Sequence, residues 1–104
     1  LVKKGNIDYG KIGSGKSGLG TINSEIDLPF SFDKGTVGLA RKQSYDTEDS
    51  QFFIILRDEP LYETEYTPIG KVIYGLEALK KIKYSDKSQY VLRPDFINSI
   101  RMLN

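Results

Sequence analysis

The side chains of this 104-residue chain that could do chemistry are amides, hydroxyls and charged groups, because the sequence contains no Cys and no His. That composition excludes disulfides, thiol or imidazole catalysis and the usual zinc sites. The polar pair Ser50 and Gln51 runs directly into the apolar stretch Phe52 to Leu56. A buried Gln amide is costly unless its donors and acceptor find partners. We therefore expect Gln51 at the rim of a core, close to other polar groups.

Residues 10–17 match the spacing of a phosphate-binding loop, G-x-x-x-x-G-K-[ST]. That motif needs a buried strand before it and a helix after it, whose N-terminus receives the phosphates. Here the preceding residues 3–8 are mostly polar, and Gly18 and Gly20 would break a following helix. About 100 residues are also too few for a parallel sheet with crossover helices. We interpret the segment as a glycine-rich surface loop that does not bind ATP.

The acidic residues 46–49 are the next candidate for chemistry. They lack the glycine-hinged pattern of a calcium loop, so we interpret them as part of an ordered surface loop and expect no metal or cofactor. The formal net charge is +1, from 15 basic and 14 acidic residues mixed along the chain. This balance does not favour nucleic acid or a membrane surface as a partner. No run approaches the roughly 18 apolar residues of a membrane-spanning helix.

Three strand-like segments surround these groups. The apolar, aromatic run 50–56 predicts a central strand with both faces inward. Residues 35–40 and 69–74 predict flanking strands, and the small residues Thr36, Gly38 and Ala40 leave one face open to close approach. Residues 22–26 predict a further short strand and Phe96 to Leu103 a closing one. Leu76, Leu79 and Ile82 recur at near-helical spacing and predict one short amphipathic helix.

Three motifs together resemble the cyclophilin family of peptidyl-prolyl isomerases, most closely its bacterial members. They are GTVGLAR at residues 35–41, SQFFI at residues 50–54 and YTPIGKV at residues 66–72. The resemblance covers nearly the whole chain but only the C-terminal two-thirds of the family domain. It implies a mainly β fold, an antiparallel barrel that is incomplete in residues 1–104 and carries one short helix. It implies no cofactor.

The resemblance also implies roles for individual residues. Phe53 would form the floor of a proline slot, with Leu1 and Tyr62 as its walls. Gln51 would contact the substrate carbonyl and orient the catalytic group. The other positions implied to contact substrate are Lys3, Gly13, the backbone of Ala40 and Arg41, Leu61 and Tyr66.

Two of these positions depart from the family pattern. Lys3 stands where a Gln is expected, so it keeps donors but loses an acceptor and adds charge. Leu61 stands where an aromatic residue is usual, and we therefore expect weak cyclosporin binding. The family's key Arg, in a strand of Phe-His-Arg type upstream of the segment matching Leu1, has no counterpart in these residues.

Two hypotheses follow. In the first, the chain represents a prolyl isomerase that acts on proline-containing peptides or unfolded proteins, and is inactive alone because the Arg segment is missing. In the second, it is a non-catalytic cyclophilin-like module that binds such peptides or a protein partner. Strand edges left unpaired in the fragment favour self-association. The sequence leaves the compartment open between cytoplasm and periplasm, because the true N-terminus is not visible.

Overall fold

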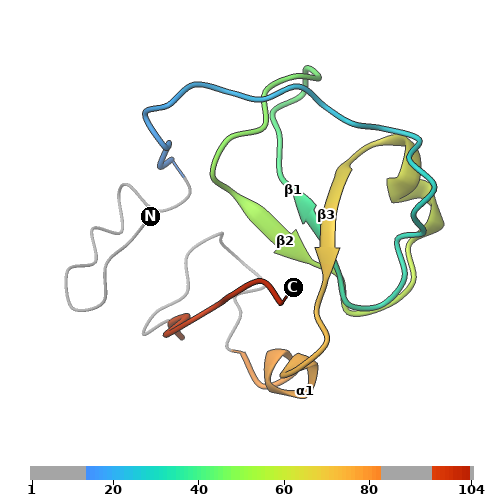
Figure 1. Cartoon of the computed structure of the whole chain (residues 1–104), viewed down its shortest axis with the longest axis vertical. Helices are drawn as coiled ribbons and strands as arrows, with labels where there is room; N and C mark the ends of the chain where they lie inside the picture. Colours follow the sequence, from blue (N-terminus) through green and yellow to red (C-terminus); the bar gives the residue numbers. More distant parts are fainter. Residues whose placement is uncertain (1–13, 83–94, 104) are drawn as a thin grey trace, which may run out of the picture. The chain divides into compact units, whose positions relative to one another are not determined.

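The computed structural model describes residues 14–82 and 95–103. The chain divides into two compact units, Lys16–Lys80 and a second made of Leu1–Gly15 with Lys81–Asn104. The helices and strands among the described residues lie in the first unit (Figure 1). In chain order they are β1 (Thr36–Leu39), β2 (Phe52–Ile54), the 3-10 helix η1 (Pro60–Thr64), β3 (Thr67–Lys71) and α1 (Leu76–Leu79).

The three strands form one antiparallel sheet in the order β2-β1-β3. Gly38 at its centre pairs with Phe53 of β2 on one side and with Pro68 of β3 on the other. The prediction that residues 50–56 form the central strand is therefore wrong within the described sheet, where β1 is central and β2 lies at an edge. The apolar sequence of β2 reflects its contacts with other side chains. It does not indicate how many strands lie beside it.

Strand β3 carries an irregularity in its pairing with β1. Val37 is opposite Gly70 and Gly38 is opposite Pro68, so that Ile69 is an extra residue, as in a β-bulge. Pro68 has no N–H to donate, which suits a strand at the edge of the described sheet. Beyond the strand, the amide of Val72 donates to the carbonyl of Gly35 at 2.8 Å and extends the pairing.

The other predicted elements are shorter than expected or absent. The helix forms only at Leu76–Leu79, after Gly75 in the left-handed conformation with φ of 87°. The predicted strand at 22–26 reduces to a single bridge between Ile22 and Glu48. The predicted closing strand is wrong, because the described residues 95–103 contain no strand. None of the described helices has the length and apolar character to cross a membrane.

The apolar core of the described residues is small and consists of Phe32, Leu39 and Ile55. The ring of Phe53 lies directly over Gly38 on the central strand. A Cβ added to Gly38 would stand 2.5 Å from Cζ of Phe53, well inside van der Waals contact. The group that approaches Gly38 is therefore the side chain of Phe53, where the expectation was another backbone or a ligand.

A polar cluster shares the interior. Glu48 is fully buried, although it lies in the acidic segment interpreted as a surface loop. Its Oε1 accepts hydrogen bonds from the hydroxyls of Ser24 at 2.6 Å and Thr67 at 3.2 Å. Burial, the strongest single influence, raises the pKa of the Glu48 carboxyl. The hydrogen bonds from Ser24, Thr67 and the backbone outweigh burial, and the pKa lies below its ordinary 4.5.

The contact between Gly38 and Phe53 gives a test of the packing. We expect Gly38→Ala to lower the free energy of unfolding by about 1–3 kcal/mol, because the new methyl group displaces the ring. Gly70→Ala is the matched control, since a Cβ at Gly70 meets nothing within 4 Å. Urea titrations of both variants measure the difference. Equal stability of the two variants would contradict the contact.

Protonation of Glu48 gives a second test. Because its folded pKa is lowered, its stabilising contribution is present above the ordinary pKa and is lost as the pH falls through the folded pKa. We expect the stability difference between the wild type and Glu48→Gln to shrink between about pH 7 and about pH 3. Urea midpoints across this range measure it. A difference that is constant with pH would show that the titration of Glu48 does not contribute.

Candidate functional site

A cluster of aromatic rings lies beside the sheet and contains three of the predicted site residues. The centroid of the Phe53 ring is 5.9 Å from that of Tyr62 and 4.9 Å from that of Tyr66, both edge to face. Tyr62 and Tyr66 are 5.0 Å apart. The buried Phe32 packs against Phe53 at 6.4 Å and against Tyr62 at 6.0 Å. The cluster combines a wide apolar surface with two phenolic hydroxyls, and such pairs favour fixed ring orientations.

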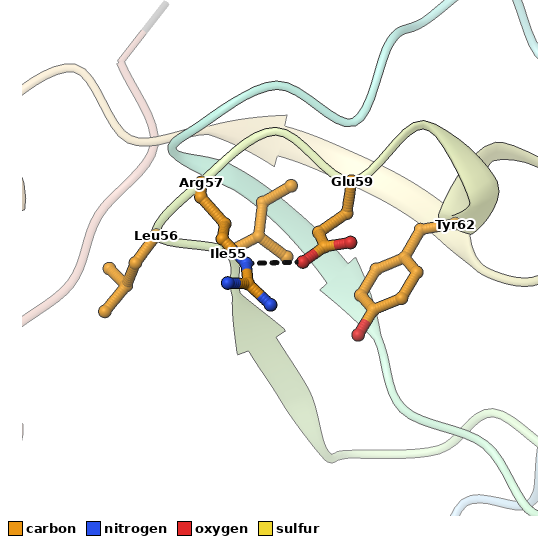
Figure 2. A pocket seen from close by; sticks show the side chains of 5 residues that line it. All are labelled: Ile55, Leu56, Arg57, Glu59 and Tyr62. Atoms are coloured by element: carbon orange, nitrogen blue, oxygen red, sulfur yellow. Dashed lines mark hydrogen bonds and ion pairs between the residues drawn. The ribbon is translucent and has the colours of Figure 1, made fainter.

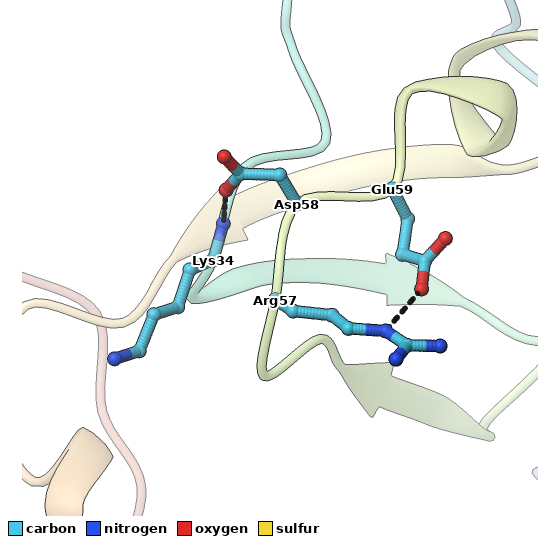
Figure 3. A network of polar contacts seen from close by, with 4 residues as sticks. All are labelled: Lys34, Arg57, Asp58 and Glu59. Carbon is cyan, nitrogen blue, oxygen red and sulfur yellow. Dashed lines mark hydrogen bonds and ion pairs between the residues drawn. The ribbon is translucent and has the colours of Figure 1, made fainter.

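The turn after β2 positions Tyr62. The backbone amide of Lys34 donates to Oδ1 of Asp58 at 2.8 Å, and Nε of Arg57 pairs with Oε1 of Glu59 at 2.8 Å (Figure 3). The amide of Glu59 also donates to the carbonyl of Phe32 at 2.9 Å. The bonds from Lys34 to Asp58 and from Glu59 to Phe32 hold residues 57–59 against residues 32–34, so that η1 begins at a fixed place.

Helix η1 then carries the chain from this turn to Tyr66. Pro60 at its start has a backbone angle suited to a helix and lacks the N–H that would otherwise be left without a partner. The amide of Tyr66 donates to the carbonyl of Tyr62 at 2.9 Å. This bond ties the backbones of the two tyrosines together, so that both rings meet Phe53.

A cavity of about 280 Å³ opens on the other side of Tyr62. Its lining residues are Ile55, Leu56, Arg57, Glu59 and Tyr62. Figure 2 shows the guanidinium of Arg57 and the carboxylate of Glu59 pointing toward each other, with the ring of Tyr62 beyond Glu59. Of the described residues of the predicted proline slot, Tyr62 lines this cavity and Phe53 does not.

The side chain of Arg41 lies at the edge of the aromatic cluster. Its guanidinium carbon is 4.2 Å from the centroid of Tyr45 and 5.5 Å from that of Tyr66, within the range of a cation–π contact. Nε donates to the carbonyl of Glu65 at 2.8 Å, and Nη1 donates to two carbonyls of its own loop. The arginine therefore fastens the start of the loop to the segment that carries Tyr66.

Two predicted site positions meet across the base of this loop. The amide of Ala40 donates to the carbonyl of Gln51 at 2.9 Å, which closes residues 41–50 into a loop. Gln51 itself is exposed. The amide of Ala40, one of the backbone groups expected to bind a peptide, is thus engaged within the fold.

The remaining predicted positions are not brought into the cluster. Leu61 projects from η1 with 78% of its surface exposed. Leu1, Lys3 and Gly13 lie outside the described residues. So does the first half of the glycine-rich segment, and residues 14–20 form no helix that could receive a phosphate.

Sequence reasoning missed three residues around the site, namely Phe32, Tyr45 and Glu48. Phe32 and Tyr45 sit in segments without strand or helix periodicity, and the neighbours of Glu48 in the sequence are all polar. The sequence feature that came closest to indicating Phe32 was its position just before the turn that leads into β1. No local pattern marks the other two.

The arrangement can bind but offers little covalent chemistry. It presents aromatic faces next to the joined backbone of Ala40 and Gln51. Within the described ranges no three Asp or Glu side chains converge to hold a metal ion. Such a surface suits an extended peptide with an apolar side chain, held by shape and hydrogen bonds.

Comparison with known proteins agrees with this reading. The family model "Cyclophilin type peptidyl-prolyl cis-trans isomerase/CLD" matches residues 1–102. A probable peptidyl-prolyl cis-trans isomerase of Brucella abortus (strain 2308) is 41% identical over 103 residues, which cover 92% of this chain and 52% of that protein. The peptidyl-prolyl cis-trans isomerase-like 3 protein of Gallus gallus is 32% identical over 88 residues, covering 80% of this chain and 54% of that protein. No solved structure gave a significant match.

The chain therefore spans about half the length of the curated relatives it matches, at 52% and 54% of their lengths. The match nevertheless runs through almost all of its own residues and includes the three motifs that first indicated the family. On this evidence the chain belongs to the cyclophilin-type peptidyl-prolyl cis-trans isomerase family.

Proposed function

We propose that the chain is the substrate-binding part of a prolyl isomerase, which accelerates rotation about X-Pro bonds in peptides and unfolded proteins. The observation that carries the proposal is the cluster of Phe53, Tyr62 and Tyr66 beside the joined backbone of Ala40 and Gln51. The ring of Phe53 offers a floor for a proline ring, with Tyr62 as a wall and Tyr66 at the rim.

The chemistry needs no covalent intermediate. Amide resonance sets a barrier of about 18–20 kcal/mol to rotation. A catalyst lowers it by binding the twisted amide more tightly than the planar one, and each tenfold gain in rate requires about 1.4 kcal/mol of that preference. In this proposal the aromatic slot holds the proline ring, and the backbone at residues 40–41 holds the preceding residue. Gln51 contacts the substrate carbonyl.

Holding the ring does not by itself favour the twisted amide. A cation or donor close to the rotating bond is also needed. Arg41 donates to the carbonyls of Glu65, Lys42 and Gln43, and Arg57 pairs with Glu59. Both described arginines near the cluster are thus engaged in holding the fold. We infer that the catalytic cation is the family's Arg, on a segment that precedes the residues matched here.

The same upstream segment would complete the fold. The described sheet is open, with β2 and β3 at its edges, and Phe52 and Ile69 are 38% and 49% exposed. In the proposed whole domain, additional strands cover these edges and close a barrel. We also expect the isolated chain to self-associate wherever the edges of the described sheet are not covered.

The alternative function is a module that binds prolyl peptides or a protein partner without catalysis. The observation that favours it is that both described arginines near the cluster are engaged in holding the fold, which a binding module without catalysis would tolerate. The coding sequence immediately upstream separates the two functions. A Phe-x-Arg strand there supports the isomerase, and a sequence without one supports the binding module.

The first prediction from the proposed function concerns activity. We expect the 104-residue chain to show little or no isomerase activity, because its aromatic slot can position a prolyl peptide but no cation is assigned to the twisted amide. Joining the upstream segment with its Arg should restore turnover. In that completed domain, Phe53→Ala should lower kcat/KM by about 10- to 100-fold, as expected for losing a buried aromatic contact. A proline-isomerisation assay on matched samples measures both effects.

Phe52→Ala in the completed domain is the control, because neighbouring strand residues point to opposite faces of the sheet. It should affect stability more than kcat/KM. Family-like turnover by the bare chain, abolished by Phe53→Ala, would mean that the missing Arg is not required.

The second prediction concerns cyclosporin. We expect weak binding to the completed domain, because the exposed Leu61 stands where the family usually offers an aromatic face. Leu61→Trp should tighten binding by about tenfold or more, through added ring area and a hydrogen-bond donor. Titration calorimetry measures the change, and Leu19→Trp, at another highly exposed leucine, is the control. Tight binding by the unmodified domain would contradict this role for Leu61.

A further inference from the structure

The loop of residues 41–50 joins two parts of the proposed substrate surface, the backbone at Ala40 and Arg41 and the amide of Gln51. The hydrogen bond from the amide of Ala40 to the carbonyl of Gln51 closes its base. Residues 42–46 are exposed, and Glu48 is the fully buried residue of the loop. A carboxylate thus occupies the place where a loop anchor would ordinarily be apolar.

Glu48 connects this loop to two other segments. Its backbone carbonyl accepts the amide of Ile22 at 2.9 Å, and its Oε1 accepts the hydroxyl of Ser24 at 2.6 Å. The same oxygen accepts the hydroxyl of Thr67, in β3, at 3.2 Å. The amide of Glu25 in turn donates to Oγ1 of Thr67 at 2.8 Å. One side chain therefore ties the loop both to residues 22–25 and to the sheet.

A second pair of bonds strengthens the same connection. The amide of Asp46 donates to Oγ of Ser24 at 2.9 Å, and the amide of Ser24 donates to Oδ1 of Asp46 at 2.8 Å. Ser24 Oγ thus receives one hydrogen bond from the loop and donates another to Glu48. The hydroxyl directions are fixed by these partners, so that both Ser24 and Thr67 donate toward Glu48.

The arrangement requires an acceptor at residue 48. Oε1 receives two hydroxyl donors, while Oε2 is buried without a hydrogen-bond partner among the described residues. A Gln could keep the two bonds to Oε1 but would place an NH₂ group where Oε2 lies, with donors that lack acceptors. An Ala would leave both hydroxyls without their acceptor.

We propose that Glu48 is a positioning residue, which holds the loop of residues 41–50 so that Ala40, Arg41 and Gln51 keep the geometry that binds a prolyl peptide. This role rests on the proposed function for its link to the peptide. That Glu48 holds the loop in place follows from its contacts alone. Glu48 touches no substrate and acts through the base of the loop.

Amide hydrogen exchange of the 104-residue chain, followed by NMR, tests the hold on the loop. In Glu48→Gln the amide of Ala40 should exchange about tenfold faster, because the loop opens locally. The amides of Gly35 and Val72, which pair with Ile55 and Gly35 beside the sheet, should keep their rates. The matched control is Glu77→Gln, which removes only an exposed ion pair with Lys80.

Ser24→Ala is the second variant and provides the test if Glu48→Gln does not fold. It removes one donor to Glu48 and should speed exchange at Ala40 in the same direction. Equal acceleration at Ala40, Gly35 and Val72 would show a general loss of stability and would overturn the proposal. Unchanged exchange at Ala40 in both variants would overturn it too.

Peptide affinity tests the link to function. The dissociation constant of a tetrapeptide with a central proline should rise about fivefold in Glu48→Gln and stay unchanged in Glu77→Gln. Unchanged affinity despite faster exchange at Ala40 would overturn the positioning role and leave the proposed function intact. A wild-type chain that binds no prolyl peptide would contradict the proposed function itself. Amide exchange would then still test whether Glu48 holds the loop in place.

Discussion

The approach of the Phe53 ring to Gly38 is the contact on which the site depends. Only a residue without a Cβ fits beneath the ring, because an added Cβ would stand 2.5 Å from it. The contact seats Phe53 on the central strand, and Phe32, Tyr62 and Tyr66 pack around the ring in that position. The fold and the candidate site thus share one residue pair, so a change that frees the ring alters both.

Few apolar side chains are buried in support of this arrangement. Buried polar groups contribute part of the stabilisation. Thr36, Glu48 and Thr67 are as buried as the apolar core residues. Hydrogen bonds are directional, so a core of this kind fixes a loop in one geometry more strictly than apolar contact does. Such a core is sensitive to substitution, because removing either partner of a hydrogen bond leaves a buried polar group unsatisfied. The loop beside the peptide surface is held in this way.

The sequence predicted the parts of the fold that depend on short-range patterns. The segments predicted as strands at 35–40 and 50–56 contain β1 and β2. The rings of Phe53, Tyr62 and Tyr66 lie together, and their contact with a peptide stays a prediction. The order of the strands was predicted incorrectly, because hydrophobicity does not record how many neighbours a strand has. The burial of Glu48 could not be predicted either. It depends on Ser24 and Thr67, which are distant in sequence and carry no local signal of their meeting.

Strand β3 is fixed at both ends by different partners. Thr67 at its start donates to the buried carboxylate, and Val72 just beyond its end donates to Gly35. A gained or lost residue cannot be absorbed by sliding the strand, since one of these bonds would break and the side chains would change faces. The extra residue at Ile69 is where the pairing already tolerates a mismatch. Evolutionary changes in the length of this strand would therefore be confined to the bulge, while exposed parts of the chain remain free to lengthen.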